Sequence, residues 1–338
     1  MLCQSIKREQ WVDKLKSTLL DVPYVHMTFT LPHELNMLAK LNQKTIYSLI
    51  QKVAWKTITA IGKEQGATYG MTSVLHTFGS DIKYHVHVHT LVTFGGIKED
   101  GSWHYPKTKN KIEKYRRICA IYKAIFIEEL LKEDVVKSVK YPQDYNELIT
   151  QSSKKRWVVH STYPTMDTDL IQNYLGRYIN RVAITNNRLI YIKKTQKVSI
   201  TYNDYANQQS GEAAPKKIKT LNPLSAIHQI LQHVLPPYYQ KTRRYGIHHS
   251  SSKVRGNIPS TLKNNHQTIR TVFEIMHHLL SIDPIACEDC GSLDLEVLSI
   301  EIVDKEELVR IFIDSLTSPP AYWKYRYSTH LSGLKKAG

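Results

Sequence analysis

The chain has 338 residues, 41% of them hydrophobic, and its 46 Lys and Arg outnumber 30 Asp and Glu to give a formal net charge of +16. A chain of this length can bury a sizeable core and indicates more than one domain. The positive charge favours a polyanion, nucleic acid first, because phosphate contacts release counterions. The sequence shows no membrane-spanning apolar run, no signal-peptide core and only four scattered cysteines. It therefore predicts a cytoplasmic protein with no membrane partner and no disulfide framework.

The predicted elements alternate between helices and strands. Hydrophobic periodicity and turn residues predict helices at 4–20, 33–64, 111–139 and 167–181, and strands at 24–30, 68–78, 83–94 and 156–163. From residue 24 the order is βαββαβα. This order indicates the α+β class, with an antiparallel split-βαβ sheet whose helices pack on one face. Residues 203–219 are predicted to be an exposed turn or linker, and helices at 221–235 and 268–280 make the C-terminal region mainly helical.

Three histidines alternate along the predicted strand at 83–94. Since strand side chains alternate between two faces, His85, His87 and His89 project from one face while valines project from the other. Neutral imidazole is a common transition-metal ligand, and neighbouring rings on one face can share an ion. The pattern favours a metal site over the alternative, a half-exposed strand that carries histidine by chance.

Two tyrosine pairs have the spacing of one helical turn. Tyr174 and Tyr178 lie on a predicted helix beside Arg177 and Arg181, so both phenols face the same side. Tyr141 and Tyr145 have the same spacing, but the following Pro142 disfavours a helix at that point. Spacing alone does not decide whether either pair is functional.

The joint pattern resembles the HUH endonucleases, in which a histidine strand precedes a helix with tyrosine. Within them the chain resembles the two-tyrosine rolling-circle transposases of bacterial insertion sequences. The resemblance runs through residues 22–35, 74–79, the histidine strand, 174–184, 198–202, 233–236 and 244–246. It places the protein in the bacterial cytoplasm, associated with the nucleoid during activity.

The resemblance implies a metal-dependent nicking and strand-transfer reaction on single-stranded DNA. Tyr174 and Tyr178 are then the nucleophiles, and the product is a 5′-phosphotyrosine link that needs no ATP to be rejoined. His87 and His89 match the HUH pair that holds Mg²⁺ or Mn²⁺, with His85 as a possible further ligand. For the third ligand His76 on the neighbouring strand is the first choice and Gln172 the second.

Basic residues are predicted to contact DNA in two places. Arg177 and Arg181 accompany the tyrosines and are assigned to phosphates, with helix-surface solubility as the alternative. Lys241, Arg243 and Arg244 belong to residues 241–249, which interleave basic and aromatic side chains. This composition suits backbone contact and base stacking on a single strand, and the alternative is a solvated basic connection.

The chain departs from the family at its start, where related chains have a cysteine-rich module that resembles a zinc ribbon. Only Cys3 is present there, so we expect no structural zinc, and we interpret Cys287 and Cys290 as a relic or loop. The predicted division is a linker helix left from that module (1–22), an HUH catalytic domain (23–185) and a C-terminal DNA-binding or accessory region (186–338). Two other functions stay open: an HUH replication initiator or relaxase, and a non-enzymatic remnant that binds nucleic acid.

Overall fold

The computed structural model describes residues 6, 9–10, 12–14, 17, 19–108, 110–141, 144–167, 181–209, 212–263, 270–280, 299–303 and 308–312. The chain forms two compact units: one is Thr18–Asn265, and the other combines Met1–Ser17 with His266–Gly338. In the described ranges no helix has the length and apolar character needed to cross a bilayer. The division at residues 22 and 185 stays a prediction.

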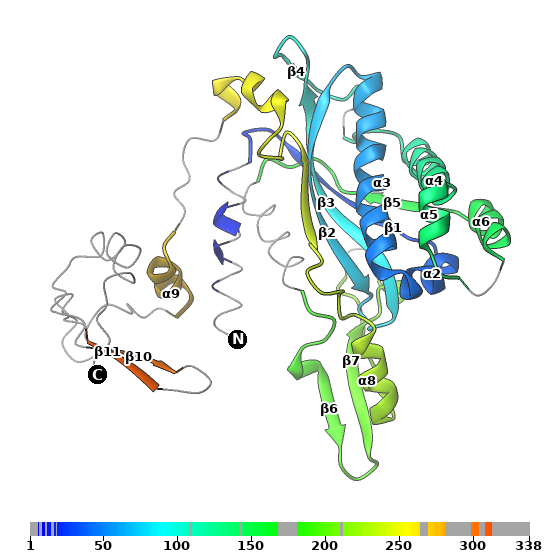
Figure 1. The fold of residues 1–338 in the computed structure, drawn as a ribbon, viewed down its shortest axis with the longest axis vertical. Coiled ribbons are helices and arrows are strands. Elements are labelled where there is room, and N and C mark those ends of the chain that lie inside the picture. The colour runs from blue at the N-terminus through cyan, green and yellow to red at the C-terminus, as the bar shows by residue number, and fades with distance from the viewer. Residues whose placement is uncertain are drawn as a thin grey trace. The chain divides into compact units, whose positions relative to one another are not determined.

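The larger unit contains an antiparallel sheet (Figure 1). Its strands are β1 (Tyr24–Thr30), β2 (Thr68–Phe78), β3 (Tyr84–Ile97), β4 (Trp103–His104), β5 (Val158–Ser161) and β9 (Thr242–Gly246). The order is β5-β1-β3-β2-β9, with β4 also paired to β3. Because β1 and β2 both pair antiparallel with β3, they run parallel with β3 between them. The predicted α+β class and split-βαβ core are thus confirmed.

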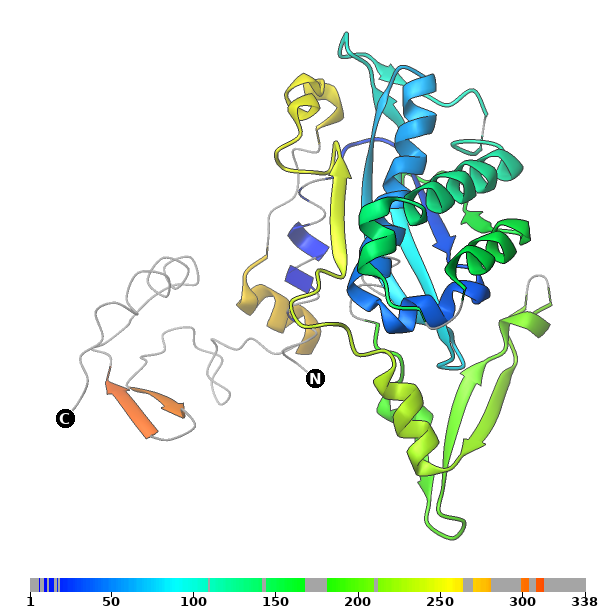
Figure 2. The ribbon, with the colours of Figure 1, turned by 45° about the vertical axis from the view of Figure 1, so that its right-hand side comes forward.

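Helices cover one face of this sheet (Figures 1 and 2). They are α2 (Asn36–Leu41), α3 (Gln43–Glu64), α4 (Tyr115–Leu130), α5 (Glu133–Ser138) and α6 (Tyr145–Lys154). The core lies between the two layers and includes Phe29 of β1 and Val86 and Val88 of β3. The Phe29 and Tyr122 rings meet at 5.1 Å, edge to face. Since side chains alternate along a strand, the histidines of β3 lie on the face away from the helices.

Several predicted helices have different bounds. The predicted helix at 33–64 is divided into a 3₁₀ turn (His33–Leu35), α2 and α3, with Asn42 between the last two. The Asn42 side-chain amide donates to the carbonyls of Leu38 and Lys140, which holds the break in place. The predicted helix at 111–139 is divided into α4 and α5. Helix α6 was not predicted, although Asp144 caps it by accepting from the backbone N–H of Asn146 and Glu147.

After residue 181 the described chain adds a small sheet and a helix. The strands β6 (Leu189–Ile192), β7 (Lys197–Asn203) and β8 (Lys216–Leu221) pair in that order, and α8 (Pro223–Leu231) follows. Short 3₁₀ turns occupy Asn186–Arg188, Tyr205–Asn207, Lys253–Asn257 and Ser260–Leu262. The linker predicted at 203–219 is wrong in its last part, because residues 216–219 pair with β7.

The smaller unit is described only in part. It contains α9 (Val272–Leu280), which confirms most of the helix predicted at 268–280, and a hairpin of β10 (Ser299–Val303) and β11 (Leu308–Phe312). The Arg270 guanidinium donates to the carboxylates of Asp13 and Glu9, at 2.9 Å for each. These ion pairs attach the N-terminal helical residues to the start of α9 within this unit. The region after residue 185, predicted to be mainly helical, contains the strands β6 to β11 as well as α8 and α9 in its described residues.

Candidate metal centre

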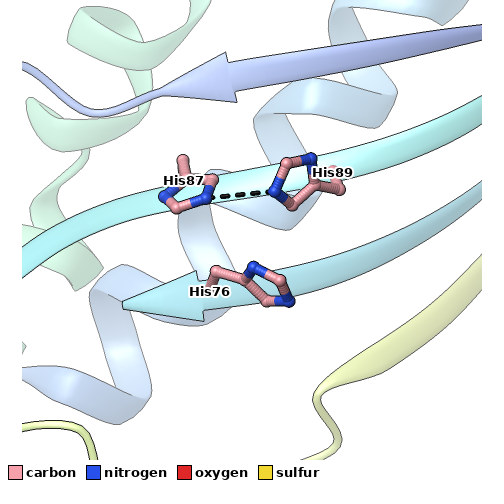
Figure 3. Close-up of side chains that lie close together, drawn as sticks. All are labelled: His76, His87 and His89. Atoms are coloured by element: carbon pink, nitrogen blue, oxygen red, sulfur yellow. Dashed lines mark hydrogen bonds between the residues drawn. The ribbon is translucent and has the colours of Figure 1, made fainter. Parts of the chain in front are cut away.

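Three histidines from two adjacent strands converge on the face of the sheet away from the helices (Figure 3). His87 and His89 come from β3, and the strand register places His76 of β2 opposite His87. All three are buried, and one ring nitrogen of each lies within 4.8 Å of the other two. Among the residues that the structure describes, these three form the group of histidine, cysteine and acidic side chains that could hold a metal ion. The structure therefore brings together His87, His89 and the predicted third ligand.

Hydrogen bonds orient two of the rings. A carbonyl oxygen only accepts, so the 2.9 Å contact between His87 Nδ1 and the His85 carbonyl places a proton on Nδ1. The Nε2 atom of His87 then has a lone pair directed at Nε2 of His89, 3.1 Å away. His89 Nδ1 in turn lies 3.0 Å from His26 Nε2 and 3.2 Å from Thr28 Oγ1, and either of them can accept from Nδ1 in the tautomer that leaves His89 Nε2 with a lone pair.

This arrangement fits a shared cation. If both rings are protonated on Nδ1, two lone pairs face each other at 3.1 Å, which is unfavourable unless a positive charge lies between them. Two ligands at right angles on one ion, each about 2.1 Å from it, are about 3.0 Å apart. The observed separation of the two Nε2 atoms matches this value.

Burial keeps His87, His89 and the neighbouring His26 uncharged. Desolvation lowers the pKa of His87 to about 3, with the neighbouring His85 as the next cause, and it lowers the pKa of His89 well below its usual value. The same effect lowers the pKa of His26 to about 3. Positive charge on Arg181 contributes to the lowered pKa of both His87 and His89. At neutral pH the rings are therefore in the deprotonated form that binds metals.

Two further histidines, His85 and His26, lie beside the cluster in positions that differ from the prediction. His85 is exposed, its ring centre 5.1 Å from that of His87, and it lies outside the three-nitrogen cluster. Its backbone carbonyl contributes by orienting His87. His26 was not singled out, although it stacks on His89 with ring centres 5.2 Å apart. The alternation of His26 with Thr28 indicates only that these two side chains share a face of β1, and the pairing with β3 decides what that face meets.

The predicted nucleophiles lie outside the described residues, as do Arg177 and Gln172. Of that segment the structure describes Arg181, whose carbonyl accepts from Lys241 Nζ at 3.3 Å. Both residues line a cavity of about 270 Å³ that also includes His76. Burial, followed by the charge of Arg181, lowers the pKa of Lys241 to about 8. Two of the predicted DNA contacts thus lie beside the histidine cluster.

The two arginines of β9 face opposite sides of the sheet. Arg243 faces the helices, where it donates to Ser48 Oγ at 2.9 Å and lies over the Tyr239 ring at 5.4 Å. Arg244 pairs with Thr72 of β2 and shares the face of the histidines. A role of either residue in DNA binding stays a prediction.

The alternative tyrosine pair lies in the helical layer. Tyr141 and Tyr145 both pack against the core between helices and sheet, and the Tyr145 hydroxyl donates to the Leu130 carbonyl at 2.9 Å. Burial raises the pKa of Tyr145 to about 12. The sheet separates this pair from the histidines, so Tyr141 and Tyr145 are poorly placed to act with them.

Comparison with known proteins identifies the family. The model of a family described as "Putative transposase" (Y2_Tnp) matches residues 70–255, which is more than half of the chain and includes all three histidines. The chain belongs to this transposase family. The resemblance predicted from the sequence is thus confirmed.

Two curated relatives have transposase names. "Putative transposase y4qJ" of Sinorhizobium fredii (strain NBRC 101917 / NGR234) is 29% identical over 256 residues, covering 72% of this chain and 63% of the relative. The transposase for insertion sequence element IS801 of Pseudomonas savastanoi pv. phaseolicola is 25% identical over 300 residues, covering 86% of this chain and 71% of the relative. This family member thus spans less than two thirds of the first relative's length. No solved structure matches it significantly.

Proposed function

We propose that this chain contains the catalytic part of a transposase that nicks single-stranded DNA and transfers the strand through a 5′-phosphotyrosine intermediate. The observation that supports this function best is the group of three buried imidazoles beside the cations Arg181 and Lys241. The group lies on the face of the sheet that the core helices leave uncovered, inside the region that matches the family. The relatives' names favour transposition over replication initiation.

In this proposal His76, His87 and His89 hold one divalent cation. Of Mn²⁺ and Mg²⁺, the nitrogen donors fit Mn²⁺ better, because Mg²⁺ strongly prefers oxygen. A divalent cation held there would polarise the scissile phosphate and stabilise its developing charge. Arg181 and Lys241 would bind the neighbouring phosphate oxygens and position the strand.

The nucleophile is assigned to Tyr174 or Tyr178. The phenol oxygen bonds to phosphorus as the phosphorus bond to the 3′ oxygen breaks, and the phenolic proton passes to solvent or a base while the leaving oxygen becomes a 3′-hydroxyl. A phenol with a pKa near 10 is a weak nucleophile at neutral pH, so it depends on charge stabilisation at the phosphate. The covalent link keeps the energy of the phosphodiester, so rejoining needs no ATP.

Substitution of the histidines tests the proposal. His87→Ala and His89→Ala should each abolish nicking of labelled single-stranded DNA in Mn²⁺ and leave binding to that DNA largely intact. His85→Ala is the matched control, because its exposed ring lies outside the cluster, and it should nick at close to the unmodified rate. If calorimetry showed unchanged Mn²⁺ binding after loss of both His87 and His89, the proposed metal site would be wrong.

A further inference from the structure

We propose that a basic groove between α4 and the segment leading into β5 is a second binding site for single-stranded DNA. The groove has a volume of about 470 Å³ and is lined by four cationic side chains, those of Arg116, Lys123, Lys155 and Arg156. None of the described residues that line it is acidic. An anionic ligand is therefore favoured over a neutral or basic one.

One wall of the groove is a stripe along α4. Arg116 and Lys123 are seven residues apart, so they project from the same side of the helix about two turns from each other. The positions between and beside them that line the groove are small: Cys119, Ala120 and Ala124. Small side chains between two cations leave a channel in which a phosphate backbone can approach the helix closely.

A surface for stacking forms where the two walls meet, because Tyr115 begins α4 and Arg156 belongs to the segment leading into β5. The Arg156 guanidinium lies over the Tyr115 ring, with its carbon 5.6 Å from the ring centre, and donates to the Tyr115 hydroxyl at 3.1 Å. Lys155 is the cation most engaged elsewhere, since its Nζ lies 3.3 Å from the Glu34 carboxylate. Trp157, which also lines the groove, is buried and donates its indole N–H to the Ser152 carbonyl.

These features fit a single strand better than a duplex or an acidic protein. Single-strand sites combine a positively charged groove with aromatic or arginine planes on which unpaired bases stack, and Tyr115 with Arg156 provides such a surface. A duplex offers its phosphates but keeps its base faces covered. An acidic peptide would gain nothing from the stacking surface.

The groove is separate from the histidine cluster. It is walled by α4, which belongs to the helical layer, and lies beside β5, whereas His76 and His87 belong to β2 and β3 and face the other side of the sheet. β5 and β3 are two strand spacings of about 4.8 Å apart, or roughly 10 Å, and the two sites lie on opposite faces of the sheet. The site thus extends the proposed function by providing a place for DNA away from the cleavage centre, but its binding requires neither the metal nor the tyrosines.

Cysteine alkylation tests the site in the unmodified chain. Cys119 lines the groove and is partly exposed, so its reaction with a maleimide can be followed by peptide mass spectrometry. An oligothymidine of about 20 nucleotides should slow this reaction, and the same length of blunt duplex or of polyglutamate should slow it less. Equal protection by polyglutamate or by duplex, or no protection by oligothymidine, would overturn the inference.

Charge reversal supplies the second test. Arg116→Glu with Lys123→Glu should weaken oligothymidine binding about tenfold and lower the slope of log affinity against log salt by about 1.4, the value for two lost single-strand phosphate contacts. The matched control is Lys193→Glu with Lys194→Glu, which makes the same charge change in the exposed turn between β6 and β7. Circular dichroism and thermal unfolding check that both variants fold.

The groove and the proposed metal centre can be tested separately. If the control pair weakened binding as much as the groove pair, the effect would be one of overall charge and the inference would be wrong. Protection of Cys119 by oligothymidine should persist after His87→Ala with His89→Ala, a variant in which nicking is lost. In the unmodified protein, protection without any nicking would contradict the proposed function alone, and nicking without protection would contradict the groove alone.

Discussion

Loss of the His26 side chain should weaken metal binding without removing a ligand. In His26→Phe an aromatic ring of similar shape can keep the stacking on His89, but the acceptor 3.0 Å from His89 Nδ1 is lost. Loss of such a supporting contact typically lowers metal affinity about 10-fold to 100-fold. Thr28 Oγ1 lies 3.2 Å from the same nitrogen and can accept its proton instead. We therefore expect His26→Phe to lower Mn²⁺ affinity about tenfold, equal to about 1.4 kcal/mol. Adding Thr28→Val should bring the loss of affinity to about 100-fold.

Mn²⁺ affinity is measured by isothermal titration calorimetry at neutral pH. His26→Gln serves as the conservative variant, because its amide oxygen can accept from His89 Nδ1 and should restore affinity close to that of the unmodified protein. If His26→Phe bound Mn²⁺ as tightly as the unmodified protein, or if His26→Gln were as weak as His26→Phe, the assigned orientation of His89 would be wrong.

Three further predictions concern stability, each measured by urea unfolding. Burial raises the pKa of Glu129, but hydrogen bonds from Lys132, Lys56 and Lys52 lower it more and hold it at about 2. Glu129→Gln should therefore lower the free energy of unfolding by about 2 kcal/mol at pH 7. Because the folded pKa is depressed, this difference should shrink as pH falls from 4.5 toward 2, and a constant difference would refute the assignment. Gly246→Ala should lower the free energy of unfolding by at least about 2 kcal/mol, since φ is +56° and a Cβ would lie 2.0 Å from the Tyr69 carbonyl oxygen of β2. The control is Gly256→Ala, whose Cβ meets nothing within 4 Å and which should leave stability nearly unchanged. Phe29→Ala should cost about 3–5 kcal/mol because the ring is fully buried, and a loss below about 1 kcal/mol would contradict that packing.

The histidine strand could be predicted from local sequence, and its surroundings only in part. Alternation along β3 is sufficient to place His87 and His89 on one face. The position of His76 opposite His87 depends on the register of a hairpin whose turn is short and visible in the sequence. His26 reaches His89 only through the pairing of β1 with β3, in which Thr28 is opposite His89, and no local pattern specifies that register.

Long-range pairing explains the main differences from the predicted fold. The residues from Thr242 to Gly246 look like a basic connection when read alone, but they form an edge strand by pairing with β2, far away in the sequence. Similarly, Asn42 interrupts a pattern that favours one long helix because its side chain bonds to the distant Lys140 carbonyl. In both cases the deciding partner lies outside any window that sequence periodicity can examine.

Mapping of a covalent DNA adduct tests the central claim most directly. Single-stranded oligonucleotides copied from the DNA that flanks the gene would be incubated with the protein and Mn²⁺ without ATP, and the adduct located by peptide mass spectrometry. We predict a 5′-phosphotyrosine at Tyr174 or Tyr178 that is lost in the double Phe variant and in His87→Ala. An adduct at Tyr141 or Tyr145, or one that persists without His87, would contradict the account.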